Sequence, residues 1–205
     1  MIVDVYPLFA SNVFVGEIEE SLDVLQKIKK YEFIDTNSYG SSKSLISKNR
    51  KILNDFPRVK QIVERSFNSV KNNFLEYSDT KFSVTTSWAT KITKESVCQF
   101  HSHTNCLYSG ILYFDDYGPD SANIEFESPY VNQQLLVKPK SYNIFNAHVY
   151  AFKPRKNLII LFQSNLRHRI TQHFSENERY SLAFNFMPIG KIGDGDSFID
   201  LSLNS

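Results

Sequence analysis

The sequence predicts a mainly β protein with supporting helices (α+β), in which two N-terminal helices cover one face of a β-sandwich or jelly roll. Three observations lead to this expectation. Apolar residues recur at helical spacing before about residue 80 and alternate with polar residues after it. Turn-rich segments such as 115–120 divide the alternating part into many short runs. The chain has 17 Phe and 11 Tyr but only 7 Gly, and aromatic side chains favour pleated strands.

The first eighty residues supply the expected helices. Residues 2–9 alternate as a short strand, and residues 17–31 form an amphipathic pattern whose acidic first turn and basic last turn match the helix dipole. The Ser-, Asn- and Gly-rich run 36–49 predicts a loop. A second helix is expected over 55–74, where Asp55 suits the N-cap, and its apolar stripe should pack against a sheet.

Short strands are expected from about residue 80 onward, each with period-two alternation and bounded by turn residues. In chain order they are 82–90, 97–103, 110–114, 123–126, 134–137, 142–145, 157–162, 168–171 and 180–186. The sequence shows neither an internal repeat nor a dividing linker. We therefore expect one domain over 1–205, with helical support over about 1–80 and a jelly-roll core over about 81–190.

The last predicted strand has two unlike faces. Odd-numbered positions from 179 to 185 carry Arg, Ser, Ala and Asn, whereas even-numbered positions from 180 to 186 carry Tyr, Leu, Phe and Phe. The first face is too polar for a dry core, and the second requires burial. A barrel whose interior holds a polar ligand satisfies both requirements.

Composition limits the expected partners and the compartment. The 23 basic and 22 acidic side chains give a net charge of +1 without a long basic tract, which argues against a nucleic-acid partner. Apolar runs fall short of the roughly 20 residues that span a bilayer. Residues 1–11 lack the basic start and apolar run of a secretion signal. We expect a soluble, cytoplasmic protein without a membrane partner; its oligomeric state stays open.

Three histidines and one arginine are the most informative residues. His101 and His103 lie two apart in a predicted strand, so both face one side with Cα atoms about 6.6 Å apart and can reach one metal ion. His168, from a distant strand, would complete three ligands and leave positions open, as at catalytic metals. Arg179 follows His168 by eleven positions and suits a clamp for a dicarboxylate. This pattern predicts a non-haem iron oxygenase.

Each residue alone also has a simpler interpretation. Paired strand histidines are often solvated, and Arg179 alone could be ion-paired with Glu176 or Glu178; the combination favours the metal site. His148 and His173 have no partner at a useful spacing and are expected at the surface.

Two cysteines flank the histidine pair, so a zinc site must be considered. Its ligands would be Cys98, His101, His103 and Cys106. Cys98 falls on the strand face opposite His101, however, and the spacing matches no common zinc module. Two ordinary thiols are the preferred interpretation.

Four segments together point to a family. They are His101-Ser102-His103, Ser109-Gly110-Ile111-Leu112-Tyr113, Leu166-Arg167-His168-Arg169 and Arg179-Tyr180-Ser181-Leu182-Ala183-Phe184-Asn185. In this order they resemble a family of 2-oxoglutarate/Fe(II)-dependent oxygenases related to prolyl hydroxylases. The similarity covers nearly the whole chain and is densest from Trp88 to Asn185. It implies a double-stranded β-helix (jelly roll) that uses Fe(II), 2-oxoglutarate and dioxygen.

The resemblance also implies roles for individual residues. The implied iron ligands are His101, His103 and His168. Arg179, with Ser181 beside it, would hold the distal carboxylate of 2-oxoglutarate, and Tyr113 would hydrogen-bond the same co-substrate. The implied reaction hydroxylates a substrate C–H bond and releases succinate and carbon dioxide, with no catalytic residue beyond the metal centre.

The histidine at position 103 departs from the wider superfamily, which has His-x-Asp or His-x-Glu here. Three neutral imidazoles would leave the Fe(II)–oxoglutarate unit about neutral, which affects metal retention and redox behaviour. Asp115 is the acidic alternative, but it lies at a turn too far along the strand. Three histidines are therefore the preferred set.

Three functions from different classes fit the sequence. The first is a 2-oxoglutarate-dependent hydroxylase of a protein side chain or small metabolite, with a nucleic-acid demethylase ranked below it. The second is a three-histidine dioxygenase of cupin type that does not use 2-oxoglutarate, which Arg179 argues against. The third is a non-catalytic jelly-roll module that binds a ligand. The substrate depends on loops such as 38–49 and 149–156, which the sequence alone does not interpret.

Overall fold

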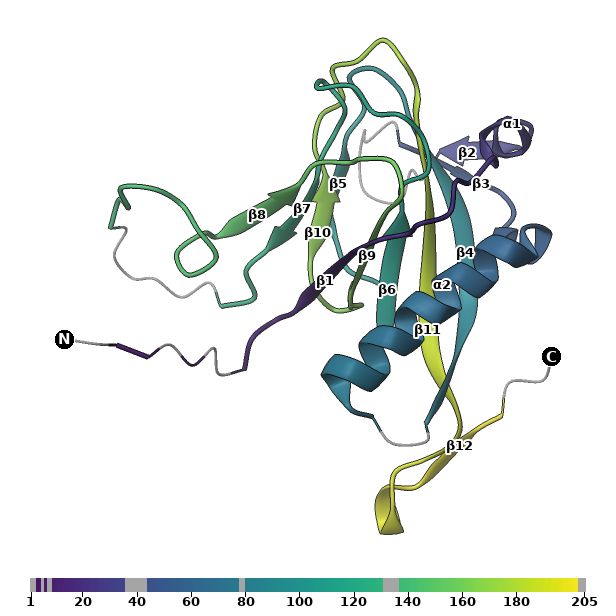
Figure 1. Ribbon diagram of the computed structural model, residues 1–205, viewed down its shortest axis with the longest axis vertical. Coiled ribbons are helices and arrows are strands. Elements are labelled where there is room, and N and C mark those ends of the chain that lie inside the picture. The colour runs from purple at the N-terminus through teal and green to yellow at the C-terminus, as the bar shows by residue number, and fades with distance from the viewer. Residues whose placement is uncertain are drawn as a thin grey trace.

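The computed structural model describes residues 3, 4, 6, 9–35, 44–77, 80–130 and 137–202. Two antiparallel sheets dominate the described part of the chain (Figure 1). The predicted mainly β architecture with helical support is confirmed. In that part, no helix is both long and apolar enough to cross a membrane.

The large sheet has eight strands, and its central strand is β11. In spatial order it runs β1 (Val13–Glu17), β9 (Leu158–Gln163), β6 (Tyr108–Leu112), β11 (Arg179–Ile192), β4 (Lys81–Ile92), β3 (Leu45–Ser47) and β2 (Phe33–Asp35). A short strand, β12 (Ile199–Leu201), pairs with the end of β11. The small sheet runs β5 (Cys98–His101), β10 (His168–Ile170), β7 (Ile124–Glu127) and β8 (Val149–Phe152).

One long helix, α2 (Pro57–Val70), covers the outer face of the large sheet (Figure 1). Its buried stripe recurs at the spacing of one helical face, as the sequence predicts: Val59, Ile62, Val63, Phe67 and Val70. The Phe67 ring stacks on Phe186 of β11 with centroids 4.3 Å apart. A 3-10 turn (Ile52–Asp55) precedes the helix and a π-helical turn (Lys71–Leu75) follows it. The even-numbered face of β11 is thereby buried under a helix.

A second apolar cluster lies between the two sheets. It contains Ile111 of β6, Ile124 of β7 and Phe162 of β9, among others. The odd-numbered face of β11 points into this space, because alternate residues of a strand face opposite sides of the sheet. The polar residues that the sequence places on that face therefore lie inside the molecule, between the sheets.

The predicted helix over 17–31 is wrong except for its last turn. Glu17 ends strand β1, and the only helical residues of this segment are those of α1 (Leu25–Ile28). The β-branched and aromatic residues of β1 pair with β9 over Val13↔Phe162 to Glu17↔Leu158. Ile18 and Leu22 reach the core from irregular backbone. Edge pairing and burial thus override the local helical pattern.

Several predicted strand bounds also change. The predicted strand 142–145 is a turn, because Asn143 Oδ1 accepts from Phe145 N and Asn146 Oδ1 accepts from Asn143 N. Strands β1, β2, β3, β8 and β12 were not predicted, and β3 lies in the segment 36–49 that was expected to be a loop. Half of the predicted strand over 2–9 and most of that over 134–137 lie outside the described residues, as does 36–43 of that loop.

Candidate active site

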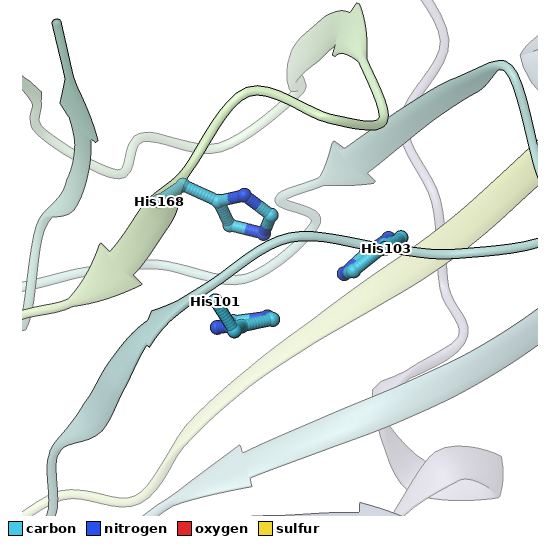
Figure 2. Close-up of side chains that lie close together, drawn as sticks. All are labelled: His101, His103 and His168. Atoms are coloured by element: carbon cyan, nitrogen blue, oxygen red, sulfur yellow. The ribbon is translucent and has the colours of Figure 1, made fainter. Parts of the chain in front are cut away.

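The three histidines singled out in the sequence come together at the facing ends of two strands. His101 ends β5, His168 begins β10, and the two are paired across these strands. Figure 2 shows the three rings gathered around one space. One ligand nitrogen from each lies within 4.8 Å of the others, so the group could hold a metal ion. In the described part of the chain, neither Asp115 nor a cysteine joins this group.

His103 reaches the group in a different way from its neighbour two positions before it. Strand β5 ends at His101, so the predicted strand to residue 103 is too long. The backbone N–H of His103 donates to the Ser164 carbonyl at 2.9 Å, which fixes the chain beyond the strand end. Its ring centroid lies 5.4 Å from that of His101 and 5.0 Å from that of His168.

Hydrogen bonds to the Nδ1 atoms leave the other ring nitrogens free. Nδ1 of His101 lies 2.8 Å from the Gln99 carbonyl, and Nδ1 of His168 lies 3.0 Å from the Leu166 carbonyl. A carbonyl oxygen only accepts, so each Nδ1 carries the hydrogen and Nε2 keeps its lone pair. Both Nε2 atoms are therefore available to a metal.

The histidines differ in how the fold shifts their pKa. Burial lowers the pKa of His168 to about 3, helped by the other two imidazoles. Burial likewise lowers the pKa of His103 to about 4, although its bond to Asn185 opposes the change. Burial also acts to lower the pKa of His101, but Cys98 and the Gln99 carbonyl outweigh it and raise the pKa. His103 and His168 are thus neutral at pH 7, the form that binds metals.

A cavity of about 420 Å³ lies beside the histidines. Its lining is mostly apolar and includes Ile92, Ile111 and Phe162. Trp88, the single tryptophan of the chain, also lines it, and its ring lies 5.5 Å from that of His103. A cavity of this size suits a small molecule or one side chain of a larger one.

Arg179 is buried in an unusual way for a cation. Its side chain begins β11 and is 1 % exposed. Nη2 donates to the Tyr113 hydroxyl at 2.7 Å, and the guanidinium carbon lies 4.9 Å from the Tyr113 ring centroid. Nε and Nη1 are buried without a hydrogen-bond partner among the described residues. Glu178 pairs with Lys91 and Glu176 with Lys94, so the ion-pair interpretation of Arg179 is not supported.

An unpaired buried cation is costly, by several kcal/mol for removing an ion from water without compensation. The orphaned N–H groups therefore fit an anion such as a carboxylate. Burial raises the pKa of the Tyr113 phenol against the opposing effect of Arg179, so Tyr113 stays protonated and can donate a hydrogen bond. Neither residue lines the cavity directly.

Ser181 connects the arginine to the cavity. It is fully buried, and its hydroxyl lies 2.5 Å from that of Thr90, which lines the cavity. Ala183 and Asn185 follow on the same face of β11 and also line the cavity. The face with odd numbers thus runs from the arginine to the histidine group, as the alternation predicts.

Two residues near the site were misjudged or missed in the sequence. His173 is fully buried rather than at the surface; its Nδ1 accepts from Ala122 N at 3.1 Å and its Nε2 bonds the Asn177 carbonyl at 2.7 Å. Asn185 is a hydrogen-bond partner of His103; the sequence placed it on the polar face and at the end of the fourth motif but gave it no role. Cys98 Sγ lies 3.7 Å from His101 Nδ1, outside the group that could hold a metal.

Residues 86–185 match the model of a family described as "Putative 2OG-Fe(II) oxygenase". The match covers almost half of the chain and includes all four motifs singled out in the sequence. No curated protein matches the chain. The family resemblance expected from the four sequence motifs is thereby confirmed, and the match indicates a 2-oxoglutarate-dependent oxygenase.

Solved oxygenase structures share the fold. HygX from Streptomyces hygroscopicus, with nickel, 2-oxoglutarate and hygromycin B bound, has a TM-score of 0.62 and 11 % identity over 87 % of this chain and 83 % of its own. A prolyl-4-hydroxylase from Pseudomonas putida has a TM-score of 0.55 and 10 % identity over 87 % and 95 %. These likenesses confirm the double-stranded β-helix. Iron or nickel and 2-oxoglutarate are present in the HygX structures, consistent with their use in this family.

Proposed function

We propose that the protein is an Fe(II)- and 2-oxoglutarate-dependent dioxygenase that hydroxylates a C–H bond of a protein side chain or small metabolite. One observation carries the proposal: three convergent histidines and a buried arginine without a partner for two of its nitrogens both border the space between the sheets, with the polar face of β11 running from one to the other. Neutral imidazoles suit Fe(II), and three of them leave coordination positions open for a co-substrate. The residues therefore fit the family's metal and its co-substrate.

His101, His103 and His168 would hold Fe(II) through their Nε2 atoms. When bound, the metal and 2-oxoglutarate supply the oxidising chemistry, in which one oxygen atom of O₂ enters succinate and the other enters the substrate as a hydroxyl, with release of CO₂. The protein's part is to bind and orient. It would present neutral ligands, hold the dicarboxylate and exclude bulk water from the space between the sheets.

Arg179 would bind the distal carboxylate of 2-oxoglutarate through its guanidinium, in which Nε and Nη1 have no partner among the described residues. Its third contact, to the Tyr113 hydroxyl, holds the guanidinium against the Tyr113 ring. Ser181 would add a hydroxyl beside the same carboxylate. A charge-assisted hydrogen bond in a dry site is among the stronger polar interactions in proteins.

The cavity lining bears on the substrate. Of the described residues that line it, the ionisable ones are the three histidines and Cys98, and it includes neither Lys, Arg, Asp nor Glu. Trp88 and Phe100 are among the remaining walls. A charged group would lose its hydration here without an opposite charge to replace it. This supports an uncharged reacting group on the substrate.

An anaerobic titration tests the proposal. Protein loaded with Fe(II) is titrated with 2-oxoglutarate while visible absorption is recorded. We expect a weak charge-transfer band that saturates, which reports chelation at an open iron site. Iron binding without the band would replace the proposal by an oxoglutarate-independent three-histidine dioxygenase. Failure to bind iron at all would leave a non-catalytic jelly-roll ligand-binding module.

A further inference from the structure

Two of the three histidines are held at Nδ1 by backbone carbonyls, but His103 is held there by side chains. We propose that Asn185, assisted by Ser109, is a positioning residue that fixes His103 in the Nδ1–H tautomer and aims its Nε2 at the metal. This inference rests on the proposed function, because it concerns the ligand set of the same site. It gives a positioning role to Asn185, a residue to which the sequence motif itself assigns no role.

The contacts form a closed network. His103 Nδ1 lies 2.8 Å from Asn185 Oδ1 and 2.9 Å from Ser109 Oγ. The Ser109 hydroxyl donates to the same Asn185 oxygen at 2.8 Å. Ser109 is fully buried and Asn185 is 9 % exposed, so water offers little competition for these bonds.

The orientation of the Asn185 amide decides the tautomer of His103. On the far side of the amide, Nδ2 donates to Thr86 Oγ1 at 2.9 Å, which turns Oδ1 toward the imidazole. An oxygen at that position requires a hydrogen on Nδ1 and leaves the Nε2 lone pair free. The reverse orientation would place an N–H donor against Nδ1, move the ring hydrogen to Nε2 and block metal binding there.

The sheet register makes this arrangement possible. Asn185 of β11 stands opposite Ser109 of β6 on one side and Thr86 of β4 on the other. The amide therefore has a fixed neighbour at each end, and both neighbours belong to regular strands. A site supported by strands is held more precisely than one supported by a loop.

His103 needs such support more than the other two histidines. It lies beyond the end of β5, between exposed Ser102 and exposed Thr104, and Asn105 has a left-handed φ of +57°. An acceptor on the outer nitrogen orients a histidine and makes its other nitrogen a better donor to the metal. Asn185 supplies that acceptor to His103.

The first test reads the tautomer without any metal. In metal-free protein with ¹⁵N-labelled histidine, nitrogen chemical shifts distinguish Nδ1–H from Nε2–H for each of the 5 histidines, once assigned by substitution. We expect His103 to be Nδ1–H in the wild type and to lose this preference in Asn185→Leu. An Nε2–H form of His103 in the wild type would overturn the inference whatever the enzyme's function.

The second test measures metal affinity by anaerobic titration with Co(II), whose visible spectrum reports the number and geometry of its ligands. Asn185→Leu should bind about 10- to 100-fold more weakly, the usual loss when the partner of a metal-binding histidine is removed. Asn185→Asp keeps an acceptor at Oδ1 and should stay within about threefold of the wild type by the same reasoning. Thr86→Val, which removes only the outer support of the amide, should fall between them.

Each outcome separates the inference from the proposed function. If the wild type fails to bind Co(II) or Fe(II), the proposed function fails, while the tautomer measurement still stands or falls on its own. If the wild type binds and Asn185→Leu binds equally well, the positioning role is wrong. If Asn185→Asp is as weak as Asn185→Leu, shape rather than hydrogen bonding matters, and the inference is overturned. Ser109→Ala, which keeps Asn185 in place, replaces Asn185→Leu if that variant does not fold and should weaken binding in the same direction.

Discussion

The two ends of the polar face of β11 are built in opposite ways. At the end near Asn185, the outer nitrogens of the three histidines all have hydrogen-bond partners within the protein. At the other end, Arg179 is 1 % exposed, yet two of its nitrogens, Nε and Nη1, have no partner among the described residues. The end that holds the three histidines, the histidine end, is therefore fully hydrogen-bonded before any ligand binds. The end that holds Arg179, the arginine end, is not.

This difference has separate consequences for metal binding at the histidines and for 2-oxoglutarate binding at Arg179. A preorganised set of ligands has little to rearrange when a metal binds, so most of the coordination energy appears as affinity. An unpaired buried cation instead raises the free energy of the ligand-free protein, and an anion relieves that cost when it binds. A substitution of Arg179 should therefore change both the stability of the ligand-free protein and its affinity for 2-oxoglutarate. A substitution of a histidine should not change these two quantities together.

The largest effect is expected from His168→Ala, which removes one of the three candidate metal ligands at the histidine end. Metal binding should weaken by more than about 100-fold, because a lost ligand costs more than a lost partner of a ligand. Isothermal titration with Fe(II) under anaerobic conditions measures the change. His148→Ala, at a half-buried position outside the cluster, is the matched control and should bind normally. Full metal occupancy in His168→Ala would remove it from the ligand set.

Arg179→Leu tests the arginine end. Affinity for 2-oxoglutarate should fall by about 100-fold or more, the loss for a charged pair in a dry site, while Fe(II) stays bound. The ligand-free variant should also be more stable than the wild type by about 1–4 kcal/mol, since an apolar side chain replaces an unpaired buried charge.

Chemical unfolding of both ligand-free proteins measures the second effect. Arg155→Leu, which removes an exposed arginine paired with Glu17, is the control and should change neither quantity. A ligand-free Arg179→Leu protein that is less stable than the wild type would contradict the view that the charge is unpaired. Unchanged affinity for 2-oxoglutarate would remove Arg179 from the co-substrate site.

Local patterns in the sequence predicted both faces of β11 and the buried stripe of α2. They also brought together His101, His103 and His168, because a two-residue spacing and a distant strand were enough to place three imidazoles on one side. Such features depend on the period of a strand or helix, which a single sequence carries directly.

Features that depend on pairing between distant segments were not predictable in this way. The apolar spacing within 17–31 is helical, yet Glu17 pairs with Leu158 at the edge of β9 and Ile18 N donates to the Asn157 carbonyl, so that helix forms only over Leu25–Ile28. Asn185 supports His103 only because the register places Ser109 and Thr86 at its two sides. His173 is buried by contacts with Ala122 and Asn177, and nothing in its local sequence indicates them.

The dependence of the ligand-free protein's stability on pH tests the histidine end. The folded-state pKa values of His168 and His103 are lowered to about 3 and about 4, below the value near 6.5 of an unfolded chain. The unfolded state therefore binds more protons below pH 6.5, and stability falls as the pH drops from about 6.5 toward about 4. The raised pKa of His101 acts in the opposite direction and offsets part of this loss.

A net loss of roughly 1–3 kcal/mol is expected between pH 6.5 and pH 5. Urea unfolding of chelator-treated protein at several pH values measures it. His168→Gln lacks one of the two titrating groups and should show a shallower dependence on pH. Stability that rises on acidification over this range would mean that the histidines are not held neutral by burial.

Tyr113→Phe gives the smallest expected effect and tests the hydrogen bond between Arg179 and Tyr113 at the arginine end. Among the described residues, the Tyr113 hydroxyl is the one hydrogen-bond partner of the Arg179 side chain, and the variant keeps the aromatic ring that the guanidinium faces. Loss of this bond should destabilise the ligand-free protein by about 1 kcal/mol and weaken 2-oxoglutarate binding by up to about tenfold, because the guanidinium loses its fixed orientation. Fe(II) affinity should not change, since the hydroxyl bonds Arg179 and not the histidines. If Fe(II) and 2-oxoglutarate binding weakened together, the two ends would be a single unit and the contrast between them would not hold.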